Sequence, residues 1–440
     1  MKTVTVGLCG LGTVGSGVWK VLERNAALIA ARSGCEIKVV HVGSRRQHAG
    51  CDTSKINVST DVFAVAQDPA VDIVVELIGG TDVARKLVLT AIENGKHVVT
   101  ANKALIAHHG AEIFAAAAAK KVAVAYEAAV AGGIPVVKAL RDGLVANRIE
   151  WIAGIINGTT NFILTEMRDK NRTFEDVLKE AQALGYAEAD PTFDVEGIDA
   201  AHKLAILAAI ALGMPLAIDR IHTEGITGIT QNDIRHAEEL GYRIKHLAIA
   251  RETAEGVELR VCPTLVPEEC LIAKVDGVQN AVMIMGDAVG STLYSGAGAG
   301  SEATASAVIA DIVDIARALT HGGIGQGKHL PVPYMGFVPE AIRERHILPI
   351  EECHSAYYLR FVAADKPGVM SEITHHLSAA GISIEALIQK EPNRNEKNVS
   401  VVLITDIVLE KTLLETVAKL ESLPSIVSPV VRLHVESLGR

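Results

Sequence analysis

The sequence lacks paired cysteines: its six cysteines are scattered over 440 residues without a CxxC pair. This scatter excludes a disulfide framework and a cysteine-based zinc site, and it favours a reducing compartment. Basic residues are also in deficit, because 42 Lys and Arg stand against 52 Asp and Glu, a net charge of −10. With no basic stripe visible, the composition argues against nucleic acid as a partner.

A long hydrophobic run is missing as well. The longest, residues 204–218, is shorter than the roughly 20 residues of a membrane span and contains Gly213 and Pro215. A strand pattern begins directly after Met1, which predicts that no signal peptide precedes the fold. A hydrophobic content of 49% with 21% charged residues then predicts a cytoplasmic globular protein of two to four domains, without a membrane partner.

The chain opens with a strand, a glycine loop and a helix. Residues 3–8 are a β-branched run, GLGTVG follows at 10–15, and a helical pattern covers 16–24. This order is the context that the G-x-G-x-x-G fingerprint of dinucleotide-binding folds requires. Gly10 would allow the tight turn, Gly12 the close approach of a pyrophosphate, and Gly15 the close packing of helix on strand.

The second strand, residues 37–42, ends in Gly-Ser-Arg-Arg. An NAD-binding domain usually has an acidic residue here for the ribose hydroxyls, whereas Arg45 and Arg46 suit a 2′-phosphate. The pattern therefore favours NADP, although a solvated basic turn is the alternative.

Further alternation of strands and helices follows. Strands are expected at residues 71–78, 96–100 and 122–126, and an alanine-rich helix at 111–121. Since the carboxyl ends of parallel strands face the ligand crevice, Lys103 is a candidate ligand or catalytic group. The alternative is a solvent-exposed lysine at a helix start.

Residues 185–203, GYAEADPTFDVEGIDAAHK, carry a cluster of carboxylates and lead into an apolar helix. A helix that is apolar on every face is normally buried. Asp199 and Lys203 share one face of it at spacing i, i+4. A surface ion pair is the common outcome of this spacing, but the buried helix favours a site for a small amino-bearing substrate.

The middle of the chain contains three structured loops. Residues 127–135 combine small residues with a proline and mark a turn between two domains. Residues 157–161, NGTTN, precede a helix, and a further helix covers 173–184. The glycine run 296–300 precedes a helix at 303–320, and its composition favours a close backbone approach over a flexible linker.

The last 85 residues change pattern. Strands at 357–363, 382–389, 399–405 and 428–435 and helices at 370–380 and 410–420 give the order βαββαβ, with a polar hairpin at 392–397. This order predicts a ferredoxin-like split unit. With DKPGV after its first strand, the segment from about 356 to 432 resembles an ACT domain.

The motifs GLGTVG, TANK, EAAVAGGIP, NGTTN, GYAEADPTFDVEGIDAAHK and GAGAG, in this order, closely resemble homoserine dehydrogenase. The resemblance implies an α/β protein with a Rossmann-type dinucleotide-binding domain, an α+β substrate and dimerisation domain, and a ferredoxin-like ACT domain. The expected boundaries are residues 1–130, with helix 303–320 packing back on them, then 131–325, a linker at 326–354, and 355–435.

The resemblance also implies an activity. The family interconverts L-homoserine and L-aspartate 4-semialdehyde with NADP or NAD, on the route to threonine, methionine and isoleucine. By motif position, Lys203 looks like the proton donor and acceptor, with Lys103 assisting. The resemblance places the substrate on Glu188, Asp199 and Asp194. The dinucleotide would contact residues of the glycine loop, of the second strand's end and of three later motifs. These are Gly10, Leu11, Gly12, Thr13, Val14, Gly15, Arg45, Arg46, Thr100, Lys103, Gly185 and Gly298.

Two further partners follow from the resemblance alone. A sodium ion, or a similar monovalent cation, would bind at the hinge through Glu127 and the backbone carbonyls of Val130, Gly132 and Ile134. The ACT domain would bind an amino-acid effector, with L-threonine expected, and an oligomerisation module without a ligand is the alternative. A homodimer or homotetramer is expected.

The chemistry is consistent with this reading. Oxidising an alcohol by hydride transfer requires removal of the hydroxyl proton. A lysine can take it when burial or a second lysine lowers its pKa, whereas a neighbouring carboxylate acts in the opposite direction. An aldehyde dehydrogenase would need a cysteine nucleophile, but no cysteine lies between Cys51 and Cys262.

Two alternatives stand beside this reading. A non-catalytic amino-acid sensor would have lost the glycine loop or the lysines, and both are present. An NADP enzyme acting on another amino acid should depart from the homoserine pattern in residues 185–203, and no departure is seen.

Overall fold

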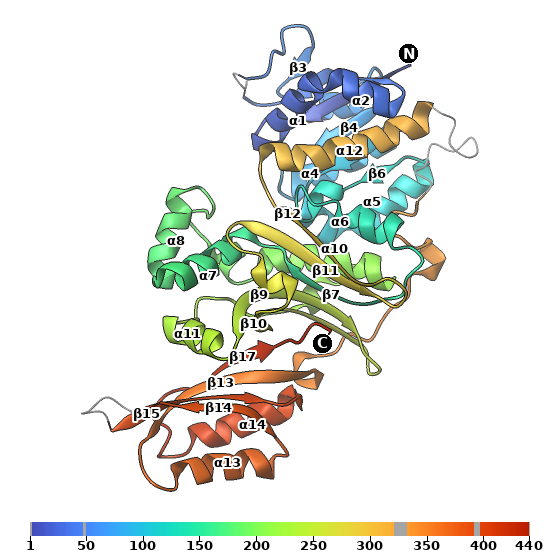
Figure 1. The fold of residues 1–440 in the computed structure, drawn as a ribbon. Helices are drawn as coiled ribbons and strands as arrows, with labels where there is room; N and C mark the ends of the chain where they lie inside the picture. Colours follow the sequence, from blue (N-terminus) through green and yellow to red (C-terminus); the bar gives the residue numbers. More distant parts are fainter. Residues whose placement is uncertain (1, 47–49, 321–331, 391–396, 440) are drawn as a thin grey trace. The chain divides into compact units, whose positions relative to one another are not determined.

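The computed structural model describes residues 2–46, 50–320, 332–390 and 397–439, in two compact units (Figure 1). The first unit contains residues 1–152, 199–219 and 278–345, and the second contains 153–198, 220–277 and 346–440. Residues 326–331 of the predicted linker and most of the hairpin predicted at 392–397 lie outside the described residues. No helix in the described part is long and apolar enough to cross a membrane.

The first unit is built on a parallel sheet with strand order β3-β2-β1-β4-β5-β6. This is the 3-2-1-4-5-6 order of a dinucleotide-binding fold, and it confirms the Rossmann prediction. The strands are β1 (Thr3–Cys9), β2 (Glu36–Gly43), β3 (Asn57–Ser59), β4 (Ile73–Glu76), β5 (His97–Thr100) and β6 (Val124–Ala125). The helices between them are α1 (Thr13–Arg24), α2 (Ala26–Ser33), α3 (Val62–Gln67), α4 (Asp82–Glu93) and α5 (Lys103–Lys120).

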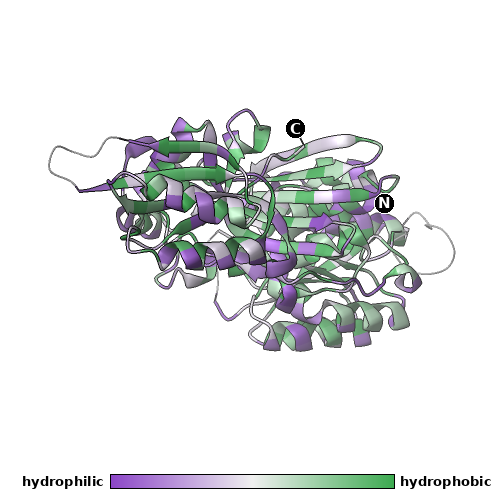
Figure 2. Ribbon diagram, turned by 90° about the horizontal axis from the view of Figure 1, so that it is seen from below, coloured by the Kyte–Doolittle hydropathy of each residue, from purple (hydrophilic) through white to green (hydrophobic). Residues whose placement is uncertain are grey.

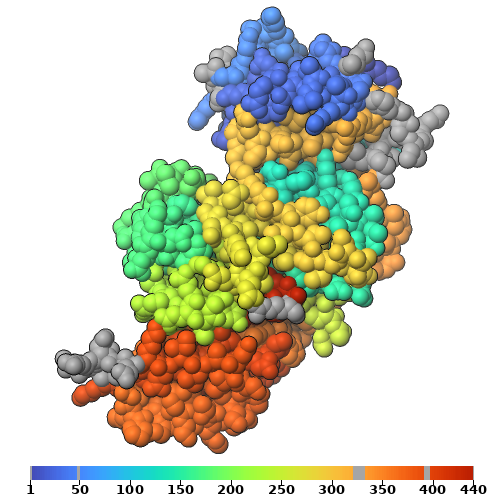
Figure 3. Space-filling model, in the orientation of Figure 1, coloured from blue at the N-terminus to red at the C-terminus, as the bar shows by residue number. Residues whose placement is uncertain are grey.

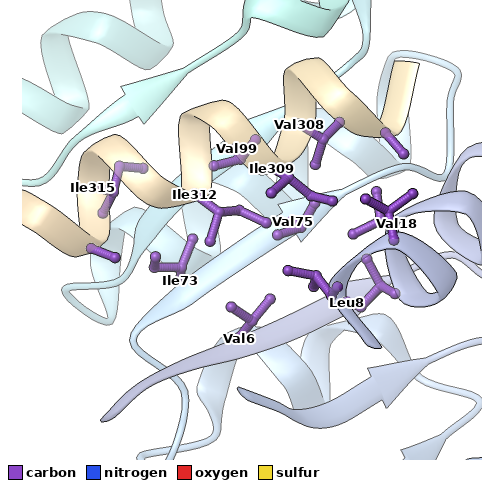
Figure 4. Close-up of a cluster of buried hydrophobic side chains, with 14 of the residues drawn as sticks. Val6, Leu8, Val18, Ile73, Val75, Val99, Val308, Ile309, Ile312 and Ile315 are labelled. Carbon is purple, nitrogen blue, oxygen red and sulfur yellow. The ribbon is translucent and has the colours of Figure 1, made fainter. Parts of the chain in front are cut away.

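Helix α12 (Ser301–Thr320), distant in sequence, packs on this sheet. Its apolar side chains, Val308, Ile309, Ile312 and Ile315, face Val75 and Val99 of the strands and Val18 of α1 (Figure 4). In the space-filling view α12 lies directly beside the N-terminal residues (Figure 3). The burial of these β-branched side chains fixes the helix on the sheet, since apolar area removed from water is the main source of stability.

The rest of the first unit holds the hinge, the buried helix and a hairpin. These are the turns η1 (Glu127–Ala129), α6 (Val136–Lys138) and η2 (Ala139–Gly143), most of helix α10 (Ile198–Leu212), the short turns η3 (Ile218–Arg220) and η5 (Pro339–Ala341), and strands β11 (Gln279–Gly286) and β12 (Gly290–Ala297). The close approach predicted for the glycine run is confirmed. A Cβ on Gly132 would lie 2.4 Å from the carbonyl oxygen of Gly298.

The second unit contains a run of strands in the order β9-β10-β17-β13-β15-β14. Its strands are β8 (His222–Thr223), β9 (Tyr242–Glu252), β10 (Val257–Pro267), β13 (His354–Ala364), β14 (Ile384–Gln389), β15 (Asn398–Thr405), β16 (Val408–Leu409) and β17 (Val431–Val435), and the unit also contains residues 153–155 of β7 (Ile149–Ile155). Its helices are α7 (Gly158–Lys170), α8 (Phe174–Ala183), α9 (Thr192–Val195), α11 (Gln231–Glu239), α13 (Val369–Ala379) and α14 (Glu410–Glu421), with turns η4 (Leu271–Lys274) and η6 (Ile350–Glu352).

The C-terminal part of this unit confirms the βαββαβ prediction. β13, α13, β14, β15, α14 and β17 follow in that order, with the two-residue strand β16 added. The strands are mostly hydrophobic, and the helices alternate hydrophobic and hydrophilic residues, as expected when one face covers a sheet (Figure 2). Tyr357, Phe361, Ile373 and Leu413 belong to the core between these elements.

One helix prediction is wrong in its start, and one helix of the second unit was missed. The helix expected at 111–121 begins at Lys103, because Asn102 caps it by accepting a hydrogen bond from the Leu105 amide. Helix α11 was not predicted at all, since its sequence QNDIRHAEE is short and polar.

Candidate functional site

The glycine loop has the geometry of a phosphate-binding turn. Gly10 has φ +103°, and a Cβ on Gly15 would lie 1.9 Å from the Gly10 carbonyl oxygen. A Cβ on Gly12 would meet no described atom within 4 Å. Open space therefore adjoins the start of α1. Leu11 and Gly12 precede the helix, and Thr13 and Val14 are its first residues.

The same helix start has uncapped donors. Among the described residues, no side chain caps α1 at Gly12. Free backbone N–H groups and the positive end of the helix dipole are suited to a phosphate group. The residues present therefore fit a dinucleotide: the backbone leaves no room for a side chain at Gly10 and Gly15, and it leaves space for a phosphate beside Gly12.

Arg45 and Arg46 follow the carboxyl end of β2 and are both exposed. The turn is ordered by Ser44, whose hydroxyl donates to the Arg46 carbonyl at 2.7 Å and accepts from the Arg46 amide at 3.4 Å. Two guanidinium groups at the end of the second strand can pair with a phosphate ester on the adenosine ribose.

Two lysines meet on one carboxylate in the first unit. Lys103 Nζ lies 3.0 Å from Asp199 Oδ1, and Lys203 Nζ lies 2.7 Å from Asp199 Oδ2. The Asp199 side chain is only 6% exposed and that of Lys203 13%, whereas Lys103 is 31% exposed. Lys103 is the first residue of α5, and Asp199 and Lys203 lie one turn apart on α10, as the i, i+4 spacing predicted.

A further titratable side chain near this group is His202, which directly precedes Lys203 on α10. Its ring contacts that of His108 edge to face, with centroids 4.9 Å apart. Burial, together with the charges of His108 and Lys103, lowers the pKa of His202 to about 4. The imidazole is therefore neutral at physiological pH.

The remaining predicted substrate residues belong to the second unit. Asp194, on α9, accepts a hydrogen bond from Asn157 Nδ2 at 2.8 Å, and Asn157 also caps α7. Glu188 is exposed, and its backbone carbonyl accepts a hydrogen bond from Gln182 Nε2. Gly185 ends the segment after α8 with φ +76°, a left-handed conformation that favours glycine.

The hinge contains buried acids. Both carboxylate oxygens of Glu127 accept backbone N–H groups, from Val137 at 2.9 Å and Lys138 at 2.8 Å. Asp311 of α12 accepts from the Glu127 amide and lies 3.3 Å from the Lys138 ammonium. Burial and the neighbouring Asp311 charge raise the pKa of Glu127 to about 7.

Lys138 and the buried Arg141 offset part of the charge of these carboxylates, and Lys138 is shared with Asp314 at 2.6 Å. A cation near Glu127 would offset this charge. Ala131 and Gly132, with φ of 54° and 49°, turn the backbone of the loop that carries the Val130, Gly132 and Ile134 carbonyls. The oxygen donors present fit a hard monovalent cation.

The sequence did not single out Glu76, Asn102 or Asp311. Glu76 and Asp311 are acids within apolar stretches, VDIVVELIGG and AVIADIVDIA, and both are buried. An unexplained acid in a buried pattern was the available signal. Asn102 stands inside the TANK motif, at a position suited to a helix cap.

Comparisons with known proteins agree along the whole chain. Family models match at residues 10–127 (homoserine dehydrogenase, NAD binding domain), 135–313 (homoserine dehydrogenase) and 357–425 (ACT domain). Homoserine dehydrogenases of Pseudomonas aeruginosa and Neisseria gonorrhoeae are 59% and 50% identical, each with 100% of both chains covered.

Solved structures give the same result. The crystal structure of a homoserine dehydrogenase from Thiobacillus denitrificans is 56% identical, covers 100% of this chain and 99% of its own, and has a TM-score of 0.93. A hyperthermophilic archaeal homoserine dehydrogenase in complex with NADPH is 25% identical, over 71% of this chain and 97% of its own, with a TM-score of 0.61. The chain therefore belongs to the homoserine dehydrogenase family, as an NAD(P)-dependent oxidoreductase with a C-terminal ACT domain.

Proposed function

We propose that Lys103, Asp199 and Lys203 form the centre that interconverts L-homoserine and L-aspartate 4-semialdehyde. The observation that carries this proposal is the single buried carboxylate of Asp199, which holds both ammonium groups within 3.0 Å. A carboxylate in this position fixes two flexible side chains at a known separation, so that little ordering remains when substrate binds.

In the oxidising direction the substrate hydroxyl loses a proton while its carbon loses a hydride. The bound dinucleotide would supply the hydride acceptor. Lys203, in its neutral form, takes the hydroxyl proton, and it returns the proton to the carbonyl oxygen in the reverse direction. Lys103 assists by placing positive charge near the oxygen, where negative charge develops.

The acidic residues would bind the substrate. Glu188 and Asp199 would hold the amino and hydroxyl region of homoserine, with Asp194 assisting. Carboxylates pair with an ammonium group through charge-assisted hydrogen bonds. Asp194 is preorganised for this role by its 2.8 Å bond from Asn157.

Replacing Lys203 by alanine tests the catalytic roles. We expect K203A to lower kcat by a factor of at least about 100, which is the lower range for a proton-transfer group. K103A should lower it as well, by a smaller factor. Lys86→Ala, an exposed lysine on α4 of the same unit, is the matched control and should keep normal turnover. A K203A enzyme with near-normal turnover would contradict the assignment.

For the cofactor, we propose NADP, with NAD as the weaker alternative. Gly10 to Gly15 would bind the pyrophosphate, Arg45 and Arg46 the 2′-phosphate, and Thr100, Lys103, Gly185 and Gly298 the remainder. Arg45→Ala should raise the KM for NADPH far more than that for NADH, because only NADPH carries the 2′-phosphate. Equal increases would refute the 2′-phosphate role.

A sodium ion or similar monovalent cation is proposed at the hinge, on Glu127 and the carbonyls of Val130, Gly132 and Ile134. Support comes from the buried carboxyl group of Glu127, whose pKa is raised by burial and by the charge of Asp311, so that a cation beside it would stabilise its ionised form. Exchanging sodium chloride for choline chloride at equal ionic strength should lower the Tm of the wild type. The Tm of a Glu127→Gln variant should not respond to this exchange, and an equal response in both would contradict the site.

The ACT domain suggests an effector. We propose that L-threonine binds it and lowers turnover, and that the chain forms a homodimer or homotetramer in the cytoplasm. The six cysteines all lie within the described residues and form no disulfide with one another, and five are buried, which is consistent with a reducing compartment. Turnover measured with and without threonine tests the effector, and sedimentation equilibrium gives the oligomeric state.

A further inference from the structure

Glu76, the last residue of β4, carries a fully buried carboxyl group in the first unit. Its Oε1 accepts from the backbone N–H groups of Ile78 at 2.9 Å and Gly79 at 3.1 Å. Its Oε2 accepts from the Thr100 hydroxyl at 2.6 Å, at the end of the neighbouring strand β5. One side chain therefore joins the loops that leave two adjacent strands.

The hydrogen bonds continue from Thr100 to Asn102, the residue before Lys103. Thr100 Oγ1 accepts from the Asn102 amide at 3.0 Å, and Asn102 Nδ2 donates to the Gly80 carbonyl at 2.6 Å. Asn102 is also the N-cap of α5, whose first residue is Lys103. Lys103 in turn lies 3.0 Å from Asp199. A continuous path thus runs from Glu76 to the site of the two lysines.

The strands that carry this path lie in the half of the sheet that would bind the nicotinamide. β4 and β5 stand on the opposite side of β1 from β2 and β3. In a sheet of this order each half takes one mononucleotide, at the carboxyl ends of its strands. The adenosine half belongs to the β2 side, with Arg45 and Arg46. The loops that Glu76 joins belong to the other half, where the reacting nicotinamide would lie.

Burying a carboxyl group is costly, and a loop could be anchored by an amide or hydroxyl. Burial raises the pKa of Glu76, although bonds from Thr100 and from the Ile78 and Gly79 amides act in the opposite direction. The two oxygens of a carboxylate can accept all three bonds at once, which an amide cannot do because its nitrogen only donates.

We propose that Glu76 is a positioning residue for the reaction: it fixes loops 77–80 and 100–103 and thereby sets the place of Lys103. This inference rests on the role proposed above for Lys103. Glu76 does not need to touch the substrate or the dinucleotide. Its effect on turnover passes through Thr100 and Asn102.

Glu76→Gln keeps the size of the side chain and one acceptor oxygen. Its amide nitrogen would face the Thr100 hydroxyl, which then loses its acceptor. We expect kcat to fall about 10- to 100-fold, the range for a small misplacement of a reacting group. The Kd for NADPH, measured by fluorescence titration, should rise by a smaller factor than kcat falls. The phosphate loop and the two arginines are untouched, and of the proposed dinucleotide contacts only Thr100 and Lys103 are shifted.

Asp72→Asn is the matched control. Asp72 immediately precedes β4, and its Oδ2 accepts from the Thr5 amide at 2.9 Å and the Thr5 hydroxyl at 2.8 Å. It makes the same kind of contacts at the opposite end of the same strand. The control should show a loss of thermal stability with normal kcat, which separates a general effect on the sheet from an effect on the site.

A double-mutant cycle decides the matter. In a K103A background, Glu76→Gln should lower the residual kcat by no more than about twofold, because the group that it positions is gone. Equal losses in both backgrounds, or a rise in the NADPH Kd that accounts for the lost activity, would overturn the proposal.

Two further variants, Thr100→Val and K103A alone, make the experiment decisive if Glu76→Gln does not fold. If Glu76→Gln does not fold, Thr100→Val removes the hydroxyl in the middle of the path, and it should show the same coupling to K103A. K103A by itself tests the role of Lys103. Normal turnover of that single variant would refute the proposed function of Lys103, whatever the Glu76 variants show.

Discussion

At the scale of single residues, buried ionisable groups either find partners or stay neutral. Asp199 belongs to the first kind, since two ammonium groups offset its charge. His246, on β9 of the second unit, is of the second kind and stays neutral. Its Nε2 lies 2.9 Å from the Glu224 carbonyl oxygen, while its buried Nδ1 has no hydrogen-bond partner among the described residues. Complete burial lowers the pKa of His246 to about 4.

This shift predicts acid destabilisation. The unfolded chain binds a proton on His246 near pH 6.5 but the folded chain only near pH 4, so stability falls as the pH is lowered through this window. His246→Gln keeps a donor for the Glu224 carbonyl and cannot titrate. Urea midpoints at pH 6.5 and 4.5 should therefore differ less in this variant than in the wild type. An unchanged difference would show that other groups dominate.

At the scale of elements, the strand–loop–helix unit at the N-terminus separates two uses of glycine. At Gly15 a side chain would collide with the Gly10 carbonyl, so that glycine serves the packing of α1 on β1. At Gly12 there is room among the described atoms for a methyl group. That space is where the phosphates would lie, so glycine there serves the ligand.

Two alanine substitutions distinguish these uses. Gly12→Ala should fold with near-normal Tm but bind NADPH at least about tenfold more weakly, since the methyl group occupies the phosphate space. Gly15→Ala should lower the Tm itself, because the backbone must move to relieve a 1.9 Å contact. Thermal unfolding with and without NADPH measures both. Equal Tm losses for the two variants would contradict this division.

The element scale also shows what the sequence could predict. Alternating buried strands, the glycine loop and the βαββαβ order were visible because strand and helix periods differ. The start of α5 was hidden by Gly110, which breaks the helical pattern in KALIAHHGAEIF. In the structure a Cβ there would lie 2.6 Å from Leu216 Cδ1, so a tertiary contact explains the glycine. The capping box of Thr230 and Asp233 was a local signal for α11 that the polar sequence concealed.

In the candidate site, too, some features could be predicted from local sequence patterns and others could not. The spacing of Asp199 and Lys203 follows from helix geometry and could be predicted. The pairing of Lys103 with Asp199 joins residues 96 positions apart, and it was not predicted: the family resemblance assigned both residues to one site without pairing them. The path through Glu76, Thr100 and Asn102 depends on which strands are neighbours, which local patterns do not contain.

At the scale of the whole molecule, the ACT segment is joined to the rest of the second unit by a shared sheet. β17 pairs in parallel with β10 and antiparallel with β13 (Figure 1). Buried ion pairs lie beside this join: Arg260, which is fully buried, contacts Glu258 and Glu436, and Arg251 also reaches Glu436. On β13, Arg360 and Tyr358 bind Asp233 of α11. The segment therefore shares its core and its charges with the rest of the second unit.

These buried pairs make the join sensitive to the loss of one partner. Glu436→Ala removes two acceptor oxygens from Arg260 and Arg251 and leaves a buried guanidinium short of its counter-charge. Breaking a buried pair in this way costs about 3–5 kcal/mol. The variant should therefore unfold several degrees below the wild type in calorimetry. Glu302→Ala, which breaks the exposed pair with Arg24, is the control and should leave the unfolding temperature nearly unchanged.

A double substitution separates charge from packing at the join. Removing both members of a buried pair is often far less costly than removing one, because no charge is left uncompensated. Arg260→Met combined with Glu436→Ala should therefore unfold at a higher temperature than Glu436→Ala alone, while Glu258 keeps its contact with Arg251 at 3.2 Å. If the double variant is instead less stable by the sum of the two single losses, the charges act independently. The join would then be held by strand pairing and apolar contacts.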